Sequence, residues 1–484
     1  PSLSVAHIVG HLKRDNSDQD ESVRYNYRLP DYTGKLGLEK TFDGYLRGQP
    51  GVRSVLVNNL GYRQSDSIPV PPQPGSNVVL TLDLEIQEAA MKALNETEGK
   101  GAAAVVIDVN SGDVVAMASI PVFDPNQFTP GISHQLWNSY LAARPSPLIF
   151  RATQERYPPG SIFKLISAVA YLEEGLIDPA EKVYNPGYFR DSKLYPNYEL
   201  DDTAPPGDYD FIRAFKRSSN TYFIHHALKP DGQTDQWRQG KQILLDWGNR
   251  FRLGQKTLAS LPGGLPSPIR ESGGYFPARD NKLKKRNQFG EKVAWAAGDV
   301  GNLCIGQGEI TVTPLQMAVM TSAVANGGKV LQPRLVKRID SQRAFGQAQN
   351  RVIPVKVLDD LHLKPETVAL MHKAMLADVA DRDGSGRAAR VPGMAIGGKT
   401  GTAQKKVPTG KYDPRSGVRL FRTDHVTWFV SFAPVESPRY AVVVMVESGE
   451  SGGTTCAPIA GRIYRAIRDL EREREKGESS LAKR

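Results

Sequence analysis

Ser161 and Lys164 place a hydroxyl and an amine three residues apart. The Pro and Gly residues before Ser161 predict that a helix begins there, and a helix would put both side chains on one face. Residues 165–172 are apolar almost all round, which indicates a buried helix. A serine attacks once a base removes its proton, and burial lowers the pKa of a lysine so that it can be that base. A single Ser-x-x-Lys still arises by chance about once or twice in such a chain.

A second hydroxyl and a side-chain amide occur together at Ser218 and Asn220, separated by Ser219. They follow a predicted helix over 210–217. Ser and Asn are common at helix starts because their side chains cap the backbone, so this stretch alone is typical of a cap.

The third stretch, Lys399-Thr400-Gly401-Thr402, lies in the predicted strand 394–403. Its glycines leave the backbone open to close approach by another chain. Strict alternation along a strand puts Thr402 on the face opposite Lys399. The lysine charge would attract a carboxylate and lower the pKa of Lys164 if the two amines lie close.

The elements that must position these residues favour an α+β fold. Five strands come from distant parts of the chain without βαβ alternation, which predicts one antiparallel sheet. These strands are expected at 104–107, 114–117, 394–403, 426–432 and 440–446, with helices in the middle of the sequence and over about 459–474. We expect a strand at 6–12 and exposed loops at 262–289 and 405–422. The charged end from Glu471 is expected to be frayed.

A proline-rich connector at 69–74 marks a domain boundary. We therefore expect a small N-terminal domain over 1–75, a large domain over 76–475 and a charged tail over 476–484.

Composition narrows the class of protein. The 484 residues are 40% hydrophobic and carry a net charge of +10, which suits an anionic surface or polymer as well as an ordinary soluble exterior. No basic stripe is interleaved with aromatic residues, so we expect no nucleic acid partner. The two cysteines lack metal-ligand spacing. The chain begins with a proline, and we expect a membrane anchor upstream of it.

The order Ser-x-x-Lys, Ser-x-Asn, Lys-Thr-Gly-Thr is the signature set of penicillin-binding proteins and serine β-lactamases. The segments 34–39, 157–161, 305–308 and 313–318 also resemble class B penicillin-binding proteins, and His425-x-Thr427-Trp428-Phe429 resembles the elongation-type penicillin-binding protein 2. This resemblance implies a transpeptidase domain with a five-stranded sheet, preceded by a truncated pedestal domain. Ile162 departs from the usual threonine, with little effect expected.

The resemblance also implies roles for the residues of the three stretches. Ser161 would attack the D-Ala-D-Ala bond of a peptidoglycan stem, Lys164 would be the base, and Ser218 would relay a proton. Asn220 would bind the substrate amide. Lys399, Thr400, Gly401 and Thr402 would bind the terminal carboxylate, and the N–H groups of Ser161 and Thr402 would form the oxyanion hole.

The family further implies β-lactam inhibition, a SEDS-family glycosyltransferase and the elongation machinery as partners, and a location on the extracytoplasmic face of the cell membrane. No cofactor is expected. Some relatives bind zinc between the first two motifs, but residues 162–217 contain no His or Cys, so no zinc is expected here.

Other interpretations remain open at the level of sequence. A D,D-carboxypeptidase or β-lactamase would use water as the acyl acceptor, and a β-lactam sensor would acylate once and signal. We do not expect a bifunctional glycosyltransferase–transpeptidase, because it would need a large extra catalytic domain and roughly the first 75 residues of this sequence are too few for one.

Overall fold

The computed structural model describes residues 3–15, 31–190, 199–228, 236–258, 260–261, 265–280, 283–286, 291–340, 350–412 and 419–481. A five-stranded antiparallel sheet lies at its centre, in the order β20-β21-β22-β6-β7. These strands are β6 (Ala102–Asp108), β7 (Val114–Ile120), β20 (Gly397–Tyr412), β21 (Arg419–Ala433) and β22 (Tyr440–Glu447). The predicted fold class, sheet type and five strands are confirmed.

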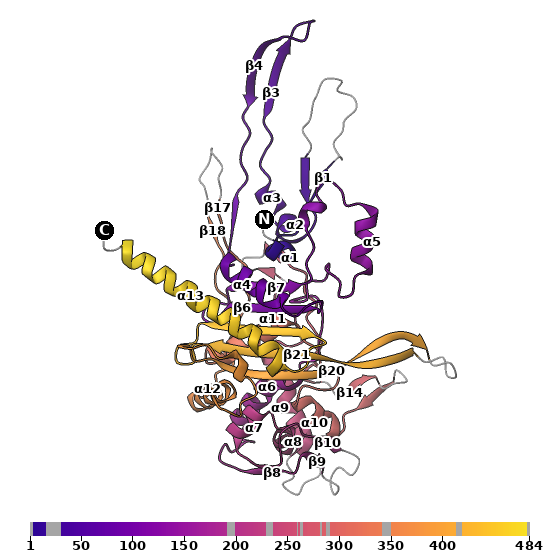
Figure 1. Cartoon of the computed structure of the whole chain (residues 1–484), viewed down its shortest axis with the longest axis vertical. Coiled ribbons are helices and arrows are strands. Elements are labelled where there is room, and N and C mark those ends of the chain that lie inside the picture. The colour runs from indigo at the N-terminus through magenta and orange to yellow at the C-terminus, as the bar shows by residue number, and fades with distance from the viewer. Residues whose placement is uncertain are drawn as a thin grey trace.

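The sheet is buried on both faces because its inner strands are apolar at successive positions. Ala103 and Val105 face a core that includes α6 and α11, whereas Ala104 and Val106 face α4 and α13. Figure 1 shows the helices on either side of the sheet. The larger helices are α4 (Leu84–Asn95), α5 (His134–Ala142), α6 (Lys164–Glu173), α7 (Phe211–Arg217), α8 (Asn220–Leu228), α9 (Gln236–Arg250), α10 (Ala297–Cys304), α11 (Pro314–Ala325), α12 (Pro365–Ala380) and α13 (Ala457–Leu481).

Short elements connect these parts. The remaining short helices are η1 (Leu3–Val5), η2 (Pro125–Gln127), η3 (Gly160–Phe163), η4 (Arg387–Ala389) and η5 (Gly452–Cys456). The short strands are β5 (Asn77–Leu80), β8 (Val183–Asn185), β9 (Tyr188–Arg190), β10 (Glu199–Asp201), β11 (Gly207–Tyr209), β12 (Ser260–Leu261), β13 (Leu265–Pro266), β14 (Leu283–Arg286), β15 (Lys292–Ala294), β16 (Lys329–Leu331), β17 (Val336–Asp340), β18 (Arg351–Val352) and β19 (Val357–Asp360).

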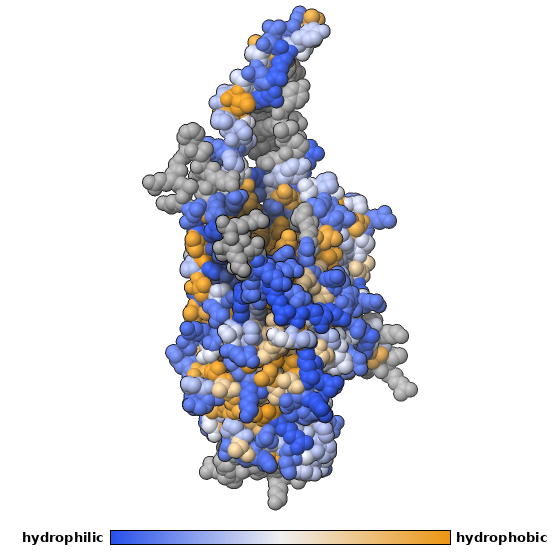
Figure 2. All heavy atoms as spheres, turned by 60° about the vertical axis from the view of Figure 1, so that its left-hand side comes forward, coloured by the Kyte–Doolittle hydropathy of each residue, from blue (hydrophilic) through white to orange (hydrophobic). Residues whose placement is uncertain are grey.

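The N-terminal region stands at one end of the molecule, and its β3–β4 hairpin projects from it (Figure 1). Every side chain of its two strands is exposed, including several apolar ones, and Figure 2 shows the hairpin at one end of the molecule. The region contains α1 (Ala6–Val9), β1 (Leu12–Asp15), β2 (Asp31–Gly34), α2 (Gly37–Thr41), α3 (Asp43–Leu46), β3 (Val52–Val57) and β4 (Arg63–Val70).

The strand predicted at 6–12 is wrong, because residues 6–9 form the helix α1. Ala6 and Ile8 are buried against the rest of the core, and the ring of His7 stacks on Phe150 at 5.0 Å. In so short a segment an apolar residue at every second position fits a strand and a helical turn equally well. Packing against the large domain decides between them.

The loop predicted at 405–422 is also wrong, because β20 continues to Tyr412 and β21 begins at Arg419. Residues 413–418 lie outside the described residues. The hairpin extends beyond the core (Figure 1), so its sequence lacks the apolar alternation that marks a half-buried strand.

Residues 262–289 are not uniformly exposed, although 262–264, 281–282 and 287–289 lie outside the described residues. Leu265, Ile269 and Phe276 are buried, and the carboxylate of Glu271 accepts a hydrogen bond from the Leu258 N–H at 2.8 Å. Glycine and proline predicted an irregular path here but not its contact with the core.

The fraying predicted from Glu471 is contradicted, because α13 continues to Leu481. Arg474 pairs with Asp83 at 2.6 Å and with Glu85 at 2.7 Å, at the start of α4, and Glu471 accepts a hydrogen bond from Tyr440. These contacts tie the charged helix to the fold. Residues 482–484 lie outside the described residues.

In the part of the chain that the structure describes, no helix is both long and apolar enough to cross a membrane.

Candidate active site

Ser161 lies in the turn η3, immediately before α6. The predicted helix start is therefore a 3₁₀ turn, and Lys164 is the first residue of the α-helix. Gly160 makes this turn possible: its φ is +56°, and its N–H donates to the carbonyl of Gly306 at 2.9 Å. Its backbone also lies close to the strand β20, where a Cβ on Gly160 would be 2.7 Å from the Thr402 carbonyl oxygen.

Lys164 connects the first motif to the second. The side chain is fully buried, and its Nζ donates to the Ser218 carbonyl at 2.7 Å and to Asn220 Oδ1 at 2.8 Å. The Ser218 hydroxyl lies 3.3 Å from the same Nζ. Burial lowers the pKa of Lys164 to about 7, and the positive charge of Lys399 contributes further. A substantial fraction of this amine is therefore neutral near pH 7 and able to accept a proton.

The second motif is held in place by Asp202, which sequence reasoning missed. One oxygen of this carboxylate accepts hydrogen bonds from the Ser219 hydroxyl and the Thr221 N–H, both at 2.7 Å. Ser218 ends α7 in the left-handed conformation, with a φ of +58°. This turn directs the backbone carbonyl of Ser218 and the amide of Asn220 to Lys164.

The third motif lies on β20, the edge strand of the sheet, next to η3. Its pairing with β21 is regular from Gly397 to Pro408, so Lys399 and Gly401 share one face of the strand and Thr400 and Thr402 share the other. A Cβ on Gly401 would be 2.8 Å from the Cγ2 atom of Ile162, so this glycine lets the strand approach η3. The alternation expected from sequence is present.

Lys399 is fully buried, and its Nζ donates to the Thr400 carbonyl at 3.1 Å. Burial lowers its pKa to about 8, opposed by the negative charge of Asp378. Thr402 is exposed, and its hydroxyl accepts a hydrogen bond from the Gly452 N–H at 3.3 Å. The hydroxyl hydrogen of Thr402 therefore stays available to a ligand.

The structure thus brings together all eight residues singled out in the three motifs. Sequence reasoning missed Asp202, Asp378 and Ser385, whose hydroxyl lies 2.5 Å from the Thr400 hydroxyl, because each acts through tertiary contacts and belongs to no short motif. Within the described residues, no cluster of three or more His, Cys, Asp or Glu side chains could bind a metal ion.

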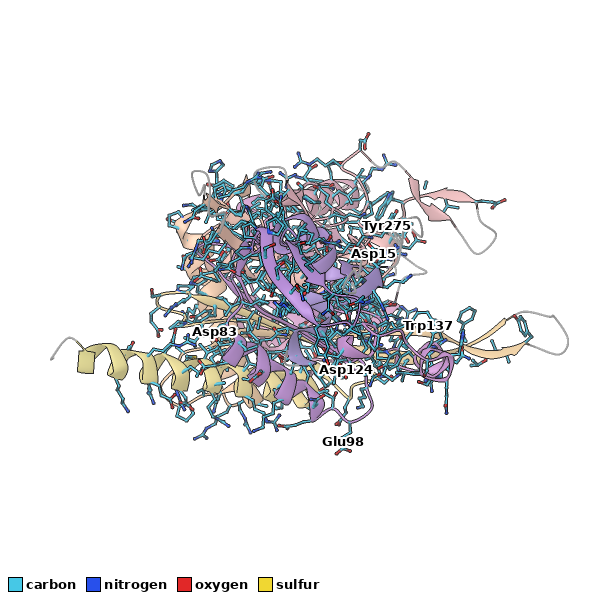
Figure 3. The ribbon with its side chains drawn as sticks, turned by 90° about the horizontal axis from the view of Figure 1, so that it is seen from above. Asp15, Asp83, Glu98, Asp124, Trp137 and Tyr275 are labelled. Atoms are coloured by element: carbon cyan, nitrogen blue, oxygen red, sulfur yellow. The ribbon has the colours of Figure 1, made fainter. Side chains whose placement is uncertain are left out.

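A separate apolar cavity of about 510 Å³ lies between the N-terminal region and the segment around α5. Figure 3 shows Trp137, one of its lining residues, on the side toward which the β20–β21 hairpin extends. None of the motif residues lines this cavity, which is formed by His11, Leu36, Phe123, Phe128, Ile132, His134, Trp137 and Leu148. We therefore place the chemistry at the edge of β20 and not in this hollow.

Comparison with protein families gives two matches. Residues 102–465 match the penicillin-binding protein transpeptidase domain, and residues 2–80 match the penicillin-binding protein dimerisation domain. The chain belongs to the penicillin-binding protein transpeptidase family. The family resemblance inferred from the three motifs is confirmed.

Individual relatives agree with this assignment. The peptidoglycan D,D-transpeptidase MrdA of Acinetobacter baumannii is 32% identical over 463 residues, which cover 93% of this chain and 62% of that relative. The crystal structure of Pseudomonas aeruginosa PBP2 in complex with WCK 5153 aligns with a TM-score of 0.71 and 30% identity, covering 96% of this chain and 88% of that one. The likeness to penicillin-binding protein 2 is thereby confirmed.

A third match comes from a structure titled "Structural coordination of polymerization and crosslinking by a peptidoglycan synthase complex". It aligns with a TM-score of 0.69 and 27% identity over 95% of this chain and 74% of that one.

Proposed function

We propose that this protein is a serine D,D-transpeptidase that crosslinks peptidoglycan stem peptides during cell-wall elongation. The observation that carries the proposal is the buried Lys164, whose Nζ binds Ser218 and Asn220 one helical turn from Ser161. The first two motifs meet at this amine, and the charge of Lys399 in the third motif helps to lower its pKa to about 7, which suits proton transfer at neutral pH.

In the proposed first step, neutral Lys164 removes the hydroxyl proton of Ser161. The serine oxygen attacks the carbonyl between the two D-alanines, and the N–H groups of Ser161 and Thr402 stabilise the oxyanion. The bond to the terminal D-alanine breaks, and Ser218 relays the proton held by Lys164 to the departing amine. An ester joins Ser161 to the remaining stem.

In the second step, an amine of a neighbouring stem attacks this ester, releasing Ser161 and forming the crosslink. Asn220 binds the amide of the donor stem throughout. Before the first step, the terminal carboxylate of the donor D-Ala-D-Ala is bound by Lys399, Thr400, Gly401 and Thr402. β-Lactams bearing a carboxylate react at the same serine because their strained amide takes the position of the scissile bond.

We further propose that residues 1–75 form a pedestal domain that contacts a SEDS-family glycosyltransferase, with the catalytic domain over 76–475 on the extracytoplasmic face of the cell membrane. The peptidoglycan synthase complex whose structure this chain resembles coordinates polymerization and crosslinking. The exposed apolar side chains of the β3–β4 hairpin offer a surface of the kind that partners cover. They include Val52, Leu56, Val57, Leu60, Tyr62 and Ile68.

The experiment that tests the enzymatic proposal is incubation with a stem peptide ending in D-Ala-D-Ala together with an amine acceptor. A transpeptidase gives the amide product and free D-alanine. Release of D-alanine with only a hydrolysed stem would indicate a carboxypeptidase. A stable acyl-enzyme with β-lactam, no turnover of peptide and no transfer would indicate a sensor. Rapid hydrolysis of the β-lactam would indicate a β-lactamase.

A further inference from the structure

Asp378 is a buried carboxyl group that the proposed mechanism does not use. It lies near the end of α12, is fully buried, and is linked to the third motif through Ser385. The Ser385 hydroxyl donates to Asp378 Oδ1 at 2.5 Å and lies 2.5 Å from the Thr400 hydroxyl. The Ser385 N–H donates to the same carboxylate oxygen at 3.2 Å.

The other oxygen, Oδ2, has no hydrogen-bond partner among the described residues. The backbone of Gly386 lies against it, so that a Cβ on this glycine would be 2.6 Å from Oδ2. A carboxylate with one oxygen unsatisfied in a buried site is costly unless a positive charge compensates it.

Lys399 is the positive charge that acts on Asp378. The other charged groups on the elements around α12 have partners of their own. Lys216 of α7 pairs with Asp381 at 2.7 Å and with Asp383 at 2.9 Å, and Arg390 beside η4 donates to the Val379 carbonyl. On α6, Lys164 binds the second motif, and α11 carries no charged side chain.

The direction of the hydrogen bonds limits what Thr400 can do in the empty site. Each hydroxyl has one hydrogen. Because Ser385 donates to Asp378, Thr400 must donate to Ser385, and its hydrogen is not available to a ligand. The Thr400 hydroxyl can donate to a ligand only if Asp378 is protonated and donates to Ser385, so that Ser385 in turn donates to Thr400.

We propose that Asp378 is ionised in the empty site, and that it takes up a proton from solvent when the carboxylate of a substrate or β-lactam binds at Thr400. The inference rests on the proposed function and deepens it. Protonated Asp378 then donates to Ser385, Ser385 donates to Thr400, and Thr400 donates to the bound carboxylate. One proton enters, the buried negative charge at Asp378 is removed, and no net charge is added around Lys399.

The electrostatics of Asp378 agree with this exchange. Burial raises its pKa to about 6, opposed by Lys399, by the hydrogen bonds from Ser385 and by the backbone N–H of Gly386. At pH 7 the group is thus mostly ionised in the empty site. A ligand carboxylate near Lys399 adds a second negative charge, which raises the pKa of Asp378 further and favours the protonated form. Asp378 is a positioning residue in this scheme, because it acts on the ligand through Ser385 and Thr400.

The test is an infrared difference spectrum of the acylation reaction at pH 7, with aspartate side-chain carboxyls labelled with ¹³C and benzylpenicillin as the probe. Acylation of the wild-type protein is expected to produce a ¹³C-shifted carboxylic-acid band with loss of a carboxylate band. The label separates this signal from the carbonyls of the ligand. Asp378→Asn is expected to abolish the new band, whereas Asp381→Asn, at a partly exposed neighbour, is expected to keep it.

A second variant keeps the proposal testable if Asp378→Asn does not fold. Ser385→Ala leaves the carboxyl group in place and removes only its hydroxyl partner, so the acid band is expected to shift in frequency or to be present already before acylation. An acylated wild-type protein without the band, a band that persists in Asp378→Asn, or a band identical in Ser385→Ala would each overturn the inference. If benzylpenicillin does not acylate the wild-type protein, the proposed function fails first, and the two failures are thus distinguished.

Discussion

The two buried lysines differ in pKa in the direction that their proposed roles require. Lys164 has the lower pKa, about 7, because it is buried and lies within the field of Lys399, whose own pKa is about 8. At neutral pH one amine is partly neutral and the other is mainly charged. This difference is what a base and a carboxylate-binding group require at the same pH.

The pH dependence of acylation follows from these values. Because Lys164 must be neutral to accept the proton of Ser161, we expect the rate of penicillin acylation to rise with pH through about 7. Lys399→Met removes the charge that lowers the pKa of Lys164, so the rise should move to higher pH. Loss of the preorganised charge should also reduce the rate at neutral pH by at least about a hundredfold. Stopped-flow measurement of acylation across the pH range checks both expectations, and an unchanged midpoint in the variant would contradict them.

Ser161 is expected to be the acylated residue. Ser161→Ala should abolish covalent labelling by a fluorescent penicillin and leave the melting temperature nearly unchanged, because the side chain lies in a partly exposed turn. Ser139→Ala, on the exposed face of α5, is the matched control and should label normally. Intact-mass analysis measures the label, and labelling that persists without Ser161 would refute the assignment.

At the scale of elements, the site depends on the close approach of η3 to β20. Trp428 on β21 supports this approach, since its Nε1–H donates to the Pro158 carbonyl at 3.0 Å. Gly160 and Gly401 remove the side chains that would otherwise separate the turn from the strand. The oxyanion hole proposed from Ser161 and Thr402 requires this spacing.

Gly160→Ala should therefore impair acylation more than its backbone strain alone explains. Its Cβ would be 2.7 Å from the Thr402 carbonyl oxygen, which forces η3 away from β20. Gly175→Ala is a matched control, because Gly175 also has a positive φ, of +70°, but a Cβ there meets no atom within 4 Å. We expect a loss of acylation rate of at least about tenfold for Gly160→Ala, and a loss of stability without this rate effect for Gly175→Ala. Equal acylation rates in the two folded variants would contradict the proposed role of the spacing.

At the scale of the whole molecule, the N-terminal region shares its core with the large domain. His7 lies between the rings of Phe123 and Phe150, and its Nε2 is 2.8 Å from the Pro147 carbonyl. Ile8 and Phe42 are buried in the same core. The contact is therefore a packed interface rather than a flexible tether.

This interface predicts that stability falls in mild acid. Burial lowers the pKa of His7 from 6.5 to about 4, so between these values the unfolded chain binds more protons than the folded one. The stability contributed by neutral His7 is present above pH 6.5 and is lost as the pH falls toward 4. His7→Phe should reduce the drop in melting temperature between about pH 7 and about pH 5. The control is His362→Phe, at a side chain that is 83% exposed, and it should leave the drop in melting temperature unchanged. If His7→Phe showed the same drop as His362→Phe, the prediction would be refuted.

The sequence by itself predicted the chemistry of the three motifs and determined the type of the sheet. The motifs and the sheet type both depend on residues that are close together in the sequence. Each motif consists of a few adjacent residues, and the central strands are apolar runs of about seven residues bounded by turns. The family membership followed from the same short segments, which is why Ser161, Lys164, Ser218 and Lys399 could be named before any contact was known.

Only the tertiary structure decided which residues position the three motifs and how burial and neighbouring charges shift the pKa values of their lysines. The carboxylate of Asp202 reaches the second motif, and Asp378 reaches Thr400 through Ser385. No local pattern reports such contacts, since each joins residues that are distant in sequence or lie on different elements. The helix at 6–9 and the ordered end of α13 have the same origin: packing and ion pairs to remote residues outweigh the weak local preferences that the sequence displays.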